Sequence, residues 1–273
     1  MVKVLFFFIF LCSKTLCSII SFEEGMEKDY HPSFYVNSAR FKASYDHANY
    51  TLVDPYIPSK IPKIIHQIWL GGNVPDKFLP LMESWKKFHP DWQYILWTDS
   101  DMDDFPFTDR KAFDKAKNFG SKADILRYEI LYRFGGVYVD VDFECIKPLD
   151  PLVHAHRFFA GIAGYDYIGN ALIGAEPGLI LFKKLNQIMN QWSDDQLCAP
   201  WIHTGPLTFT RHVYHFIRSH PQGVCIYPTL FFHPFPNQFR FEYWNSHLER
   251  SFIESFFIPE TFAVHYWAES WNK

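Results

Sequence analysis

Residues 121–150, SKADILRYEILYRFGGVYVDVDFECIKPLD, constrain the fold more than any other stretch of the chain. Their first half predicts a helix, because Ile and Leu recur on one side of it. Ser121 is the expected N-cap, with Asp124 in the first turn, where the helix dipole favours an anion. The Gly-Gly pair at 135–136 is expected to end the helix. The β-branched and aromatic residues 137–141 then predict a central strand.

Two carboxylates, Asp140 and Asp142, lie at the end of this predicted strand. Their spacing places both on one face of a regular strand. Without a partner they would repel each other and lose solvation, and a divalent cation removes both problems. Oxygen ligands suit Mg²⁺ or Mn²⁺, ions that often carry substrate phosphates. The pattern therefore predicts a metal–diphosphate site at the carboxyl end of a strand, where open α/β sheets bind ligands. A solvated strand end is the alternative.

The D-x-D pattern occurs twice more, at Asp99/Asp101 and Asp101/Asp103. Both copies fall in the polar run DSDMDD, which predicts a loop. For these two pairs we favour solvated loop carboxylates, because they lie in this polar run.

A longer resemblance supports the site at Asp140 and Asp142. The segment SKADILRYEILYRFGGVYVDVD resembles the sugar-binding region with DXD motif of glycosyltransferases. The similar group includes yeast-type α-1,6-mannosyltransferases, inositol-phosphoceramide mannosyltransferases and α-1,4-galactosyl- and N-acetylglucosaminyltransferases, and its core is shared with the large clostridial glucosylating toxins. The resemblance covers about residues 61–271 and implies a GT-A-like α/β fold, with a mostly parallel sheet flanked by helices.

The resemblance also implies roles for individual residues. Asp142 and His265 would bind the metal, Asp140 would hydrogen-bond the sugar or ribose, and the remaining donor-site residues would be Trp69 (stacked on the base), Asp124, Arg127, Tyr138, Asn170, Ser270 and Trp271 (over the diphosphate). Asp140, Asp142 and Arg127 are the predicted catalytic residues. Plain structural alternatives remain open for several of them: a core Trp69, a turn at Asn170, and a surface ion pair between Asp124 and Arg127.

The rest of the chain alternates between short apolar runs and helical patterns. Residues 64–70, 92–97 and 158–162 predict strands, and residues 80–89 and 179–192 predict helices. This alternation favours parallel β-α units. The segment His203–Pro206 resembles a family segment that begins a helix near the acceptor side. His233, in a stretch rich in Phe and Pro, is expected to be structural.

Composition limits the class of protein. The chain has 273 residues, of which 48% are hydrophobic, and this suits one globular domain, with or without a small subdomain. Its net charge of −4 gives no reason to expect a nucleic-acid partner. Of the cysteines beyond residue 17, Cys145 is expected to be a buried thiol, whereas Cys198 and Cys225 could form a disulfide.

The first 17 residues contain an apolar run at positions 4–12, too short to span a bilayer comfortably. They predict a signal peptide or signal anchor, with a buried N-terminal strand as the alternative. Residues 18–60 would be a lead segment or stem, and 61–273 the GT-A domain. The expected location is the secretory pathway (Golgi or ER lumen) or outside the cell, with membrane association through the N-terminus.

The function that follows is a metal-dependent retaining glycosyltransferase using Mn²⁺ or Mg²⁺. It would move a hexose from a nucleotide sugar, a UDP-sugar or GDP-mannose, to a glycan, glycolipid or protein. The alternatives are an inactive sugar- or partner-binding module on the same fold and a toxin-like enzyme that modifies host proteins. A phosphatase that works through an aspartyl phosphate is disfavoured, because Glu144 stands where that class needs Thr or Val.

Overall fold

The computed structural model describes residues 20–26, 38–47, 58–164, 167–197, 199–245 and 248–268. The predicted signal segment at 1–17 and the predicted donor residues Ser270 and Trp271 lie outside these ranges. Within the described ranges, no helix is both long and apolar enough to cross a membrane.

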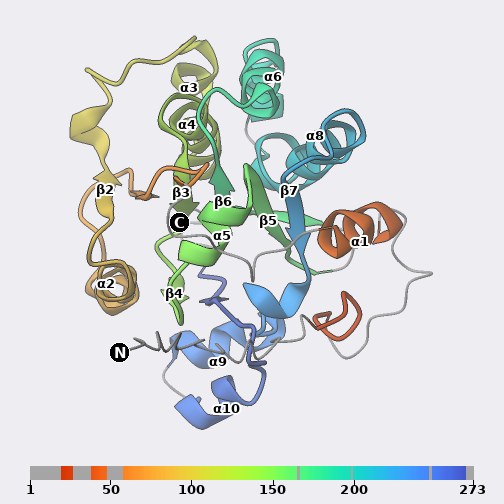
Figure 1. Cartoon of the computed structure of the whole chain (residues 1–273). Helices are drawn as coiled ribbons and strands as arrows, with labels where there is room; N and C mark the ends of the chain where they lie inside the picture. The colour runs from red at the N-terminus through yellow and green to blue at the C-terminus, as the bar shows by residue number, and fades with distance from the viewer. Residues whose placement is uncertain are drawn as a thin grey trace, which may run out of the picture.

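A six-stranded sheet forms the centre of the molecule (Figure 1), in the order β2-β1-β3-β6-β5-β7. Its strands are β1 (Ile64–Ile68), β2 (Gln93–Trp97), β3 (Gly136–Val139), β5 (Phe158–Ile162), β6 (Ile168–Ala175) and β7 (Val224–Tyr227). β1 pairs in parallel with β2 and β3, and β5 with β7, whereas β6 runs antiparallel to both β3 and β5. The predicted mostly parallel sheet flanked by helices is confirmed, with β6 as its one reversed strand.

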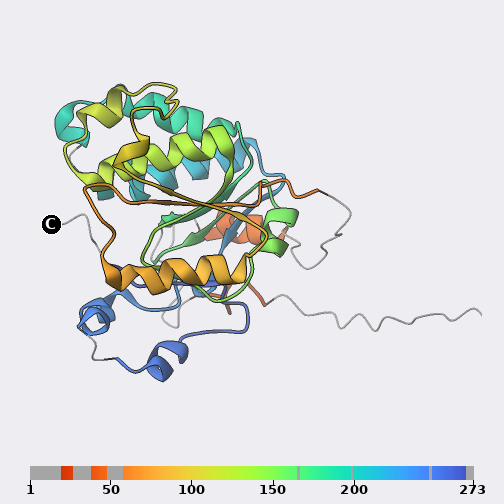
Figure 2. The same cartoon turned by 90° about the vertical axis from the view of Figure 1, so that its left-hand side faces the viewer.

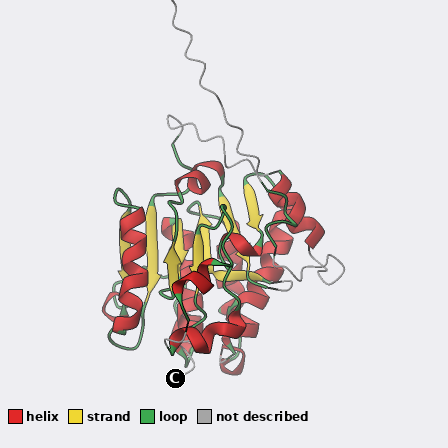
Figure 3. Ribbon diagram, turned by 90° about the horizontal axis from the view of Figure 1, so that it is seen from below, coloured by secondary structure: helices red, strands yellow, loops and turns green. Residues whose placement is uncertain are grey.

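Helices cover both faces of this sheet (Figures 1 and 2). On one face α4 packs on α6, which packs on α8, and on the other α2 packs against β4. The helices are α1 (Ser38–Asp46), α2 (Leu79–Phe88), α3 (Lys111–Lys115), α4 (Phe119–Phe134), α5 (Asp150–Ala155), α6 (Ile180–Met189), α7 (Asp194–Leu197), α8 (Pro206–Ser219), α9 (Arg240–Trp244) and α10 (Arg250–Glu254). The view from below shows the strands side by side with helices around them (Figure 3). Helices predicted at 80–89 and 179–192 are therefore present as α2 and α6.

A second, two-stranded sheet joins β4 (Phe143–Cys145) to β8 (Ala263–His265) in antiparallel pairing. A separate apolar cluster supports it and includes Val141, Val264 and Tyr266. The little sheet thus ties the C-terminal segment to the chain directly after β3, although the two are more than 100 residues apart in sequence. This connection builds the site described below.

The described part of the lead segment packs against the main body of the protein. Phe22, Phe41 and Tyr45 are buried in the principal apolar core. The Ile226 N–H of β7 donates a hydrogen bond of 3.1 Å to the Ser44 hydroxyl. The predicted boundary at residue 61 stays a prediction, but these contacts place the described lead residues against the sheet edge formed by β7.

The thiols of Cys145 and Cys225 are both free and buried. Cys145 therefore matches its expected state. Cys198, the proposed disulfide partner of Cys225, lies outside the described residues.

The long helix α4 begins three residues earlier than the sequence interpretation implied. Its N-cap is Asn118, whose side-chain Oδ1 accepts a 2.7 Å hydrogen bond from the Ser121 N–H. The expectation of Ser121 as the cap was wrong, because Ser121 is already inside the helix and fully buried. At the other end Gly135, with φ of +62°, ends the helix as predicted.

Replacing Asn118 by alanine is expected to lower the free energy of unfolding by about 1 kcal/mol, because a helix donor loses its side-chain acceptor. Chemical denaturation of the two proteins measures the difference. Asn118→Asp is the matched control, since it keeps the accepting oxygen and adds charge where the helix dipole favours an anion. Equal losses in both variants would contradict a capping role.

Candidate active site

The two central carboxylates lie where the chain leaves the main sheet. β3 ends at Val139, Asp140 follows it, and a turn through Asp142 leads into β4. The prediction of one regular strand through residues 137–141 was therefore wrong at its end, because the turn redirects the chain from the main sheet into the small one. The backbone of Asp140 is held by its N–H to the Ala171 carbonyl at 2.8 Å and by Gln67 Nε2 to its own carbonyl at 3.3 Å.

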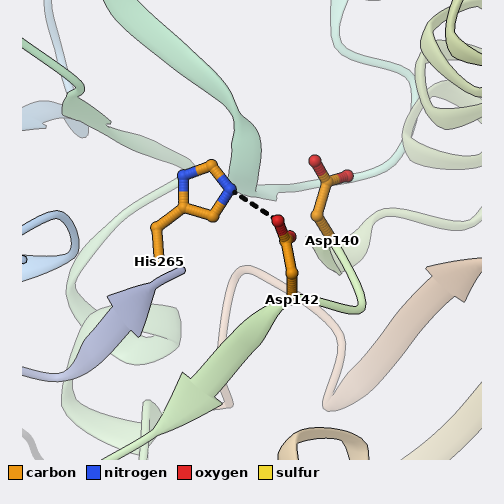
Figure 4. Close-up of side chains that lie close together, drawn as sticks. All are labelled: Asp140, Asp142 and His265. Carbon is orange, nitrogen blue, oxygen red and sulfur yellow. Dashed lines mark ion pairs between the residues drawn. The ribbon is translucent and has the colours of Figure 1, made fainter. Parts of the chain in front are cut away.

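The antiparallel register of β4 and β8 brings His265 to these carboxylates. Phe143 pairs directly with His265, and their rings stack with centroids 4.4 Å apart. His265 Nε2 then lies 3.3 Å from Asp142 Oδ2 (Figure 4). The Ala268 N–H also donates to Asp142 Oδ2, at 2.7 Å. One ligand atom from each of Asp140, Asp142 and His265 lies within 4.8 Å of the others.

The charges of this cluster fit a cation. Burial raises the pKa of Asp140, and the neighbouring charge of Asp142 raises it further, although Arg127 opposes both effects. Burial also disfavours the charged form of Asp142, but His265 and the Ala268 N–H together hold its pKa below the usual value. Two acids that repel each other beside an imidazole form a donor set that suits Mn²⁺, whereas Mg²⁺ prefers oxygen alone. The Asp140 side chain is 29% exposed, so a ligand can reach it.

Arg127 connects the cluster to α4. Its Nη1 lies 3.3 Å from Asp140 Oδ1 and donates to the Asn170 carbonyl at 2.5 Å. Its Nη2 lies 3.2 Å from Asp124 Oδ1, and its guanidinium lies 4.4 Å from the Tyr138 ring centroid. Burial disfavours the guanidinium charge, but the surrounding acidic groups outweigh it and raise the pKa of Arg127. The alternative of a surface ion pair was wrong, because Asp124 and Arg127 are each only 5% exposed.

Asp124 forms the inner end of the same network. Its Oδ1 accepts a hydrogen bond from Asn170 Nδ2 and its Oδ2 accepts one from Thr204 Oγ1, both at 2.7 Å. Burial raises the pKa of Asp124 to about 6, although Arg127, Thr204 and Asn170 each favour its charged form. Asn170 lies within strand β6, so the alternative of a turn asparagine was wrong.

This pKa predicts a pH dependence of stability. The native state holds a proton on Asp124 up to about pH 6, whereas the unfolded chain releases it near the ordinary value of 3.8. The native state therefore binds more protons between these values, and the stability contributed by Asp124 falls as pH rises through that window. From pH 4 to pH 7 the wild type should lose about 2 kcal/mol of unfolding free energy relative to Asp124→Asn. Denaturation of both proteins across this range, with metal removed, measures it. A constant difference would contradict the raised pKa.

Several predicted residues lie around this centre rather than in it. Trp69 follows β1 and is half-buried, with its Nε1 donating to the Asn73 carbonyl at 3.0 Å and its ring 5.4 Å from that of Phe78. Its predicted stacking on a base stays a prediction. Tyr138, by contrast, is buried, and its hydroxyl donates to Asp140 Oδ1.

Two of the other D-x-D carboxylates, Asp99 and Asp101, have local partners. Asp99 accepts hydrogen bonds from the Gly71 and Gly72 N–H groups, and Asp101 closes a capping box with Thr98. Glu144, which argued against a phosphatase, instead accepts hydrogen bonds from Arg250 and Tyr266.

Two network residues were missed by sequence reasoning. Thr204 belongs to a π-helix, Pro200–Thr204, and its neighbour Gly205 leaves no room for a side chain between Pro200 and Asp124. Tyr128 donates to the Thr204 carbonyl at 2.9 Å and accepts from Asn170. The resemblance of His203–Pro206 to a segment of the family could have pointed to Thr204. Tyr128 carried no signal, because its spacing on α4 resembles that of any core residue.

A family model described as "Glycosyltransferase sugar-binding region containing DXD motif" matches residues 75–159. Residues 75–159 are thus similar to the sugar-binding region of DXD-motif glycosyltransferases, and we call them the DXD region. This DXD region contains Asp124, Arg127, Tyr138, Asp140 and Asp142, whereas Trp69, Asn170 and His265 lie outside the match.

The curated proteins similar to this chain include two from Schizosaccharomyces pombe. Inositol phosphoceramide mannosyltransferase 3 is 44% identical over 98 residues, which are 34% of this chain and 28% of the relative. Inositol phosphoceramide mannosyltransferase 1 is 30% identical over 190 residues, 66% of this chain and 60% of the relative. The chain thus spans less than two thirds of the length of either. Among solved structures, the PaToxG glycosyltransferase has a TM-score of 0.46 at 21% identity, covering 58% of this chain and 71% of that one.

Proposed function

We propose that this protein is a metal-dependent retaining glycosyltransferase that moves a hexose from a nucleotide sugar to an acceptor. The observation that carries the proposal is the cluster of Asp140, Asp142 and His265, whose ligand atoms lie within 4.8 Å of one another at the end of β3. The matched DXD region supplies both carboxylates. Retention, and hence an α-linked product, is implied by the family that the sequence resembles.

In this proposal Asp142 and His265 hold the cation, and Mn²⁺ is favoured over Mg²⁺ because one donor is an imidazole nitrogen. A bound divalent cation would neutralise charge on the departing nucleoside diphosphate. Asp140, which is partly exposed, accepts a hydrogen bond from a hydroxyl group of the sugar or ribose. Arg127 fixes Asp140 through their 3.3 Å contact, and Asp124 and Asn170 hold Arg127 in turn. The buried residues thus orient Asp140 rather than leaving it to a flexible loop.

The relatives' names favour one donor sugar and one acceptor class among those that the sequence leaves open. Both S. pombe relatives are named as inositol phosphoceramide mannosyltransferases. We therefore place a mannosyl donor such as GDP-mannose ahead of UDP-hexoses, and a glycolipid acceptor ahead of glycan or protein. A location in the secretory pathway is part of the same proposal.

The test is donor hydrolysis by the purified full chain across a panel of GDP- and UDP-sugars. Each donor is assayed with Mn²⁺, with EDTA, and with Mn²⁺ restored after EDTA. Mn²⁺-dependent turnover of one donor would establish the reaction class and name the donor. Nucleotide binding without turnover, even after addition of a lipid-linked acceptor, would favour the inactive binding module. The proposal would be overturned if the protein neither bound nor hydrolysed any of these donors.

Trp69→Ala is expected to raise the KM for the donor roughly tenfold while leaving kcat nearly unchanged, because a base–aromatic stack is worth about 1–3 kcal/mol. Steady-state kinetics with the donor found above measure both constants. Trp69→Phe, which retains a ring, is the matched control and should recover most of the affinity. An unchanged KM in Trp69→Ala would return Trp69 to its alternative role as a packing residue.

A further inference from the structure

Two large apolar side chains lie exposed on the π-helix that completes the buried network. Trp201 is 47% exposed and Ile202 is 50% exposed. Tyr167, from the segment before β6, packs its ring edge-to-face on Trp201 with centroids 5.0 Å apart. Single exposed apolar residues are ordinary on protein surfaces. Here two neighbouring apolar side chains are exposed together, and a third ring packs against one of them. We call this surface, formed by Tyr167, Trp201 and Ile202, the apolar lip.

The apolar lip is held in place by the active-site network. Three residues beyond Trp201, the fully buried Thr204 donates to Asp124 at 2.7 Å. The Ile202 carbonyl accepts a 3.0 Å hydrogen bond from Thr208 of α8. π-Helical turns are rare and often occur at functional sites. Asp124 in turn lies 3.2 Å from Arg127, and Arg127 lies 3.3 Å from Asp140, so a chain of direct contacts joins the π-helix to the site.

The charge around the lip indicates what kind of surface it suits. α7 contacts the π-helix and presents two exposed carboxylates, Asp194, which lies 3.6 Å from Lys115 Nζ, and Asp195, so that the net charge there stays negative. These acids would oppose attachment to an anionic membrane. Trp, which has an apolar body and a polar N–H, is a side chain that favours the interface of a bilayer with water. A zwitterionic lipid surface therefore fits both the rings and the charges.

We propose that the apolar lip inserts into the surface of a zwitterionic lipid bilayer and so presents the site to a lipid-linked acceptor. The choice of a lipid over a protein partner rests on the proposed function, in which a glycolipid is the favoured acceptor. Because the lip and Asp124 are joined through Thr204, docking at the membrane would occur beside the donor network and not at a remote face.

The first test uses the full chain and phosphatidylcholine vesicles with brominated acyl chains, which quench nearby Trp fluorescence. The vesicles should quench a larger fraction of the Trp fluorescence in the wild type than in Trp201→Phe. This variant keeps an apolar ring but lacks the indole that reports insertion. This difference isolates Trp201 from the other tryptophans and from any binding by the N-terminus. Equal quenching of the two proteins would overturn the proposal.

The second test measures the partition of variants onto unbrominated phosphatidylcholine vesicles. Trp201→Ser/Ile202→Ser should partition roughly tenfold less than the wild type, because the apolar area available for burial is lost. Ile180→Ser is the matched control: Ile180 is 36% exposed and begins α6 at the end away from the lip. Partition should change little with salt, and equal partition of the double variant and the wild type would overturn the proposal.

Donor hydrolysis without acceptor separates this proposal from the proposed function. The lip variants should hydrolyse the donor as the wild type does, which also reports that they fold. If the wild type hydrolyses no donor, the proposed function fails, while vesicle quenching still decides whether the lip binds lipid. If the double variant does not fold, the conservative Trp201→Phe comparison remains decisive.

Discussion

Replacing Arg127 by leucine is expected to lower the free energy of unfolding by about 3–5 kcal/mol, the usual cost of removing one partner from a buried ion pair. Asp124 would keep its buried position without a cation, and Asp140 would lose its contact at 3.3 Å. Two acids would then have to remain charged in a poorly solvated site or take up protons. Chemical denaturation at neutral pH measures the loss.

The matched control for Arg127→Leu is Lys122→Leu, a change of the same charge on the same helix at a half-buried position. It should cost less than about 1 kcal/mol. The double variant Arg127→Leu/Asp124→Asn should lose less stability than the sum of its single variants, since the stranded charge of Asp124 is removed. The loss in Arg127→Leu should also shrink in acid, where Asp124 is protonated. Additive losses that do not depend on pH would refute the ion-pair explanation.

Most secondary-structure elements could be predicted because their signals are local. The apolar runs of β1, β2 and β5 and the amphipathic pattern of α6 lie within a few consecutive residues. The position of the N-cap was missed because Asn118 and Ser121 are both good capping residues, and the choice depends on packing. Ser121 faces the buried Thr204, with the two hydroxyls 3.4 Å apart, and this contact comes from a distant part of the chain.

Sequence reasoning named the three clustered residues, Asp140, Asp142 and His265, but did not predict the geometry that brings them together. Strand alternation explained Asp140 and Asp142 on one face, but the structure brings them together through a turn between two sheets. The resemblance identified His265, while its approach to Asp142 depends on the pairing of β4 with β8, a long-range contact that no local pattern reveals. Ser270 and Trp271 lie outside the described residues, so their roles stay predictions.

Asp142→Asn is expected to reduce metal-dependent turnover of the donor by about 10²–10³-fold, comparable to the loss of one preorganised group that stabilises transition-state charge. The asparagine keeps the size of the side chain and an oxygen for the Ala268 N–H, which now donates to Asp142 at 2.7 Å. It removes the negative charge that pairs with His265 and that, in the proposed function, attracts the cation. The affinity for Mn²⁺ should fall together with turnover, and titration followed by the electron paramagnetic resonance signal of free Mn²⁺ measures it independently.

Asp103→Asn is the matched control, since it alters an exposed carboxylate of another D-x-D pair by the same chemistry. Both turnover and Mn²⁺ affinity should be unchanged in it. Asp140→Asn should separate the two carboxylates, because Asp140 is the partly exposed acid beside Arg127 and its proposed task is to bind the sugar or ribose. It should therefore raise the KM for the donor more than it weakens Mn²⁺ binding. If Asp142→Asn retained full turnover with the same Mn²⁺ requirement, the cation would have to bind elsewhere, and the cluster with His265 would be a structural ion pair.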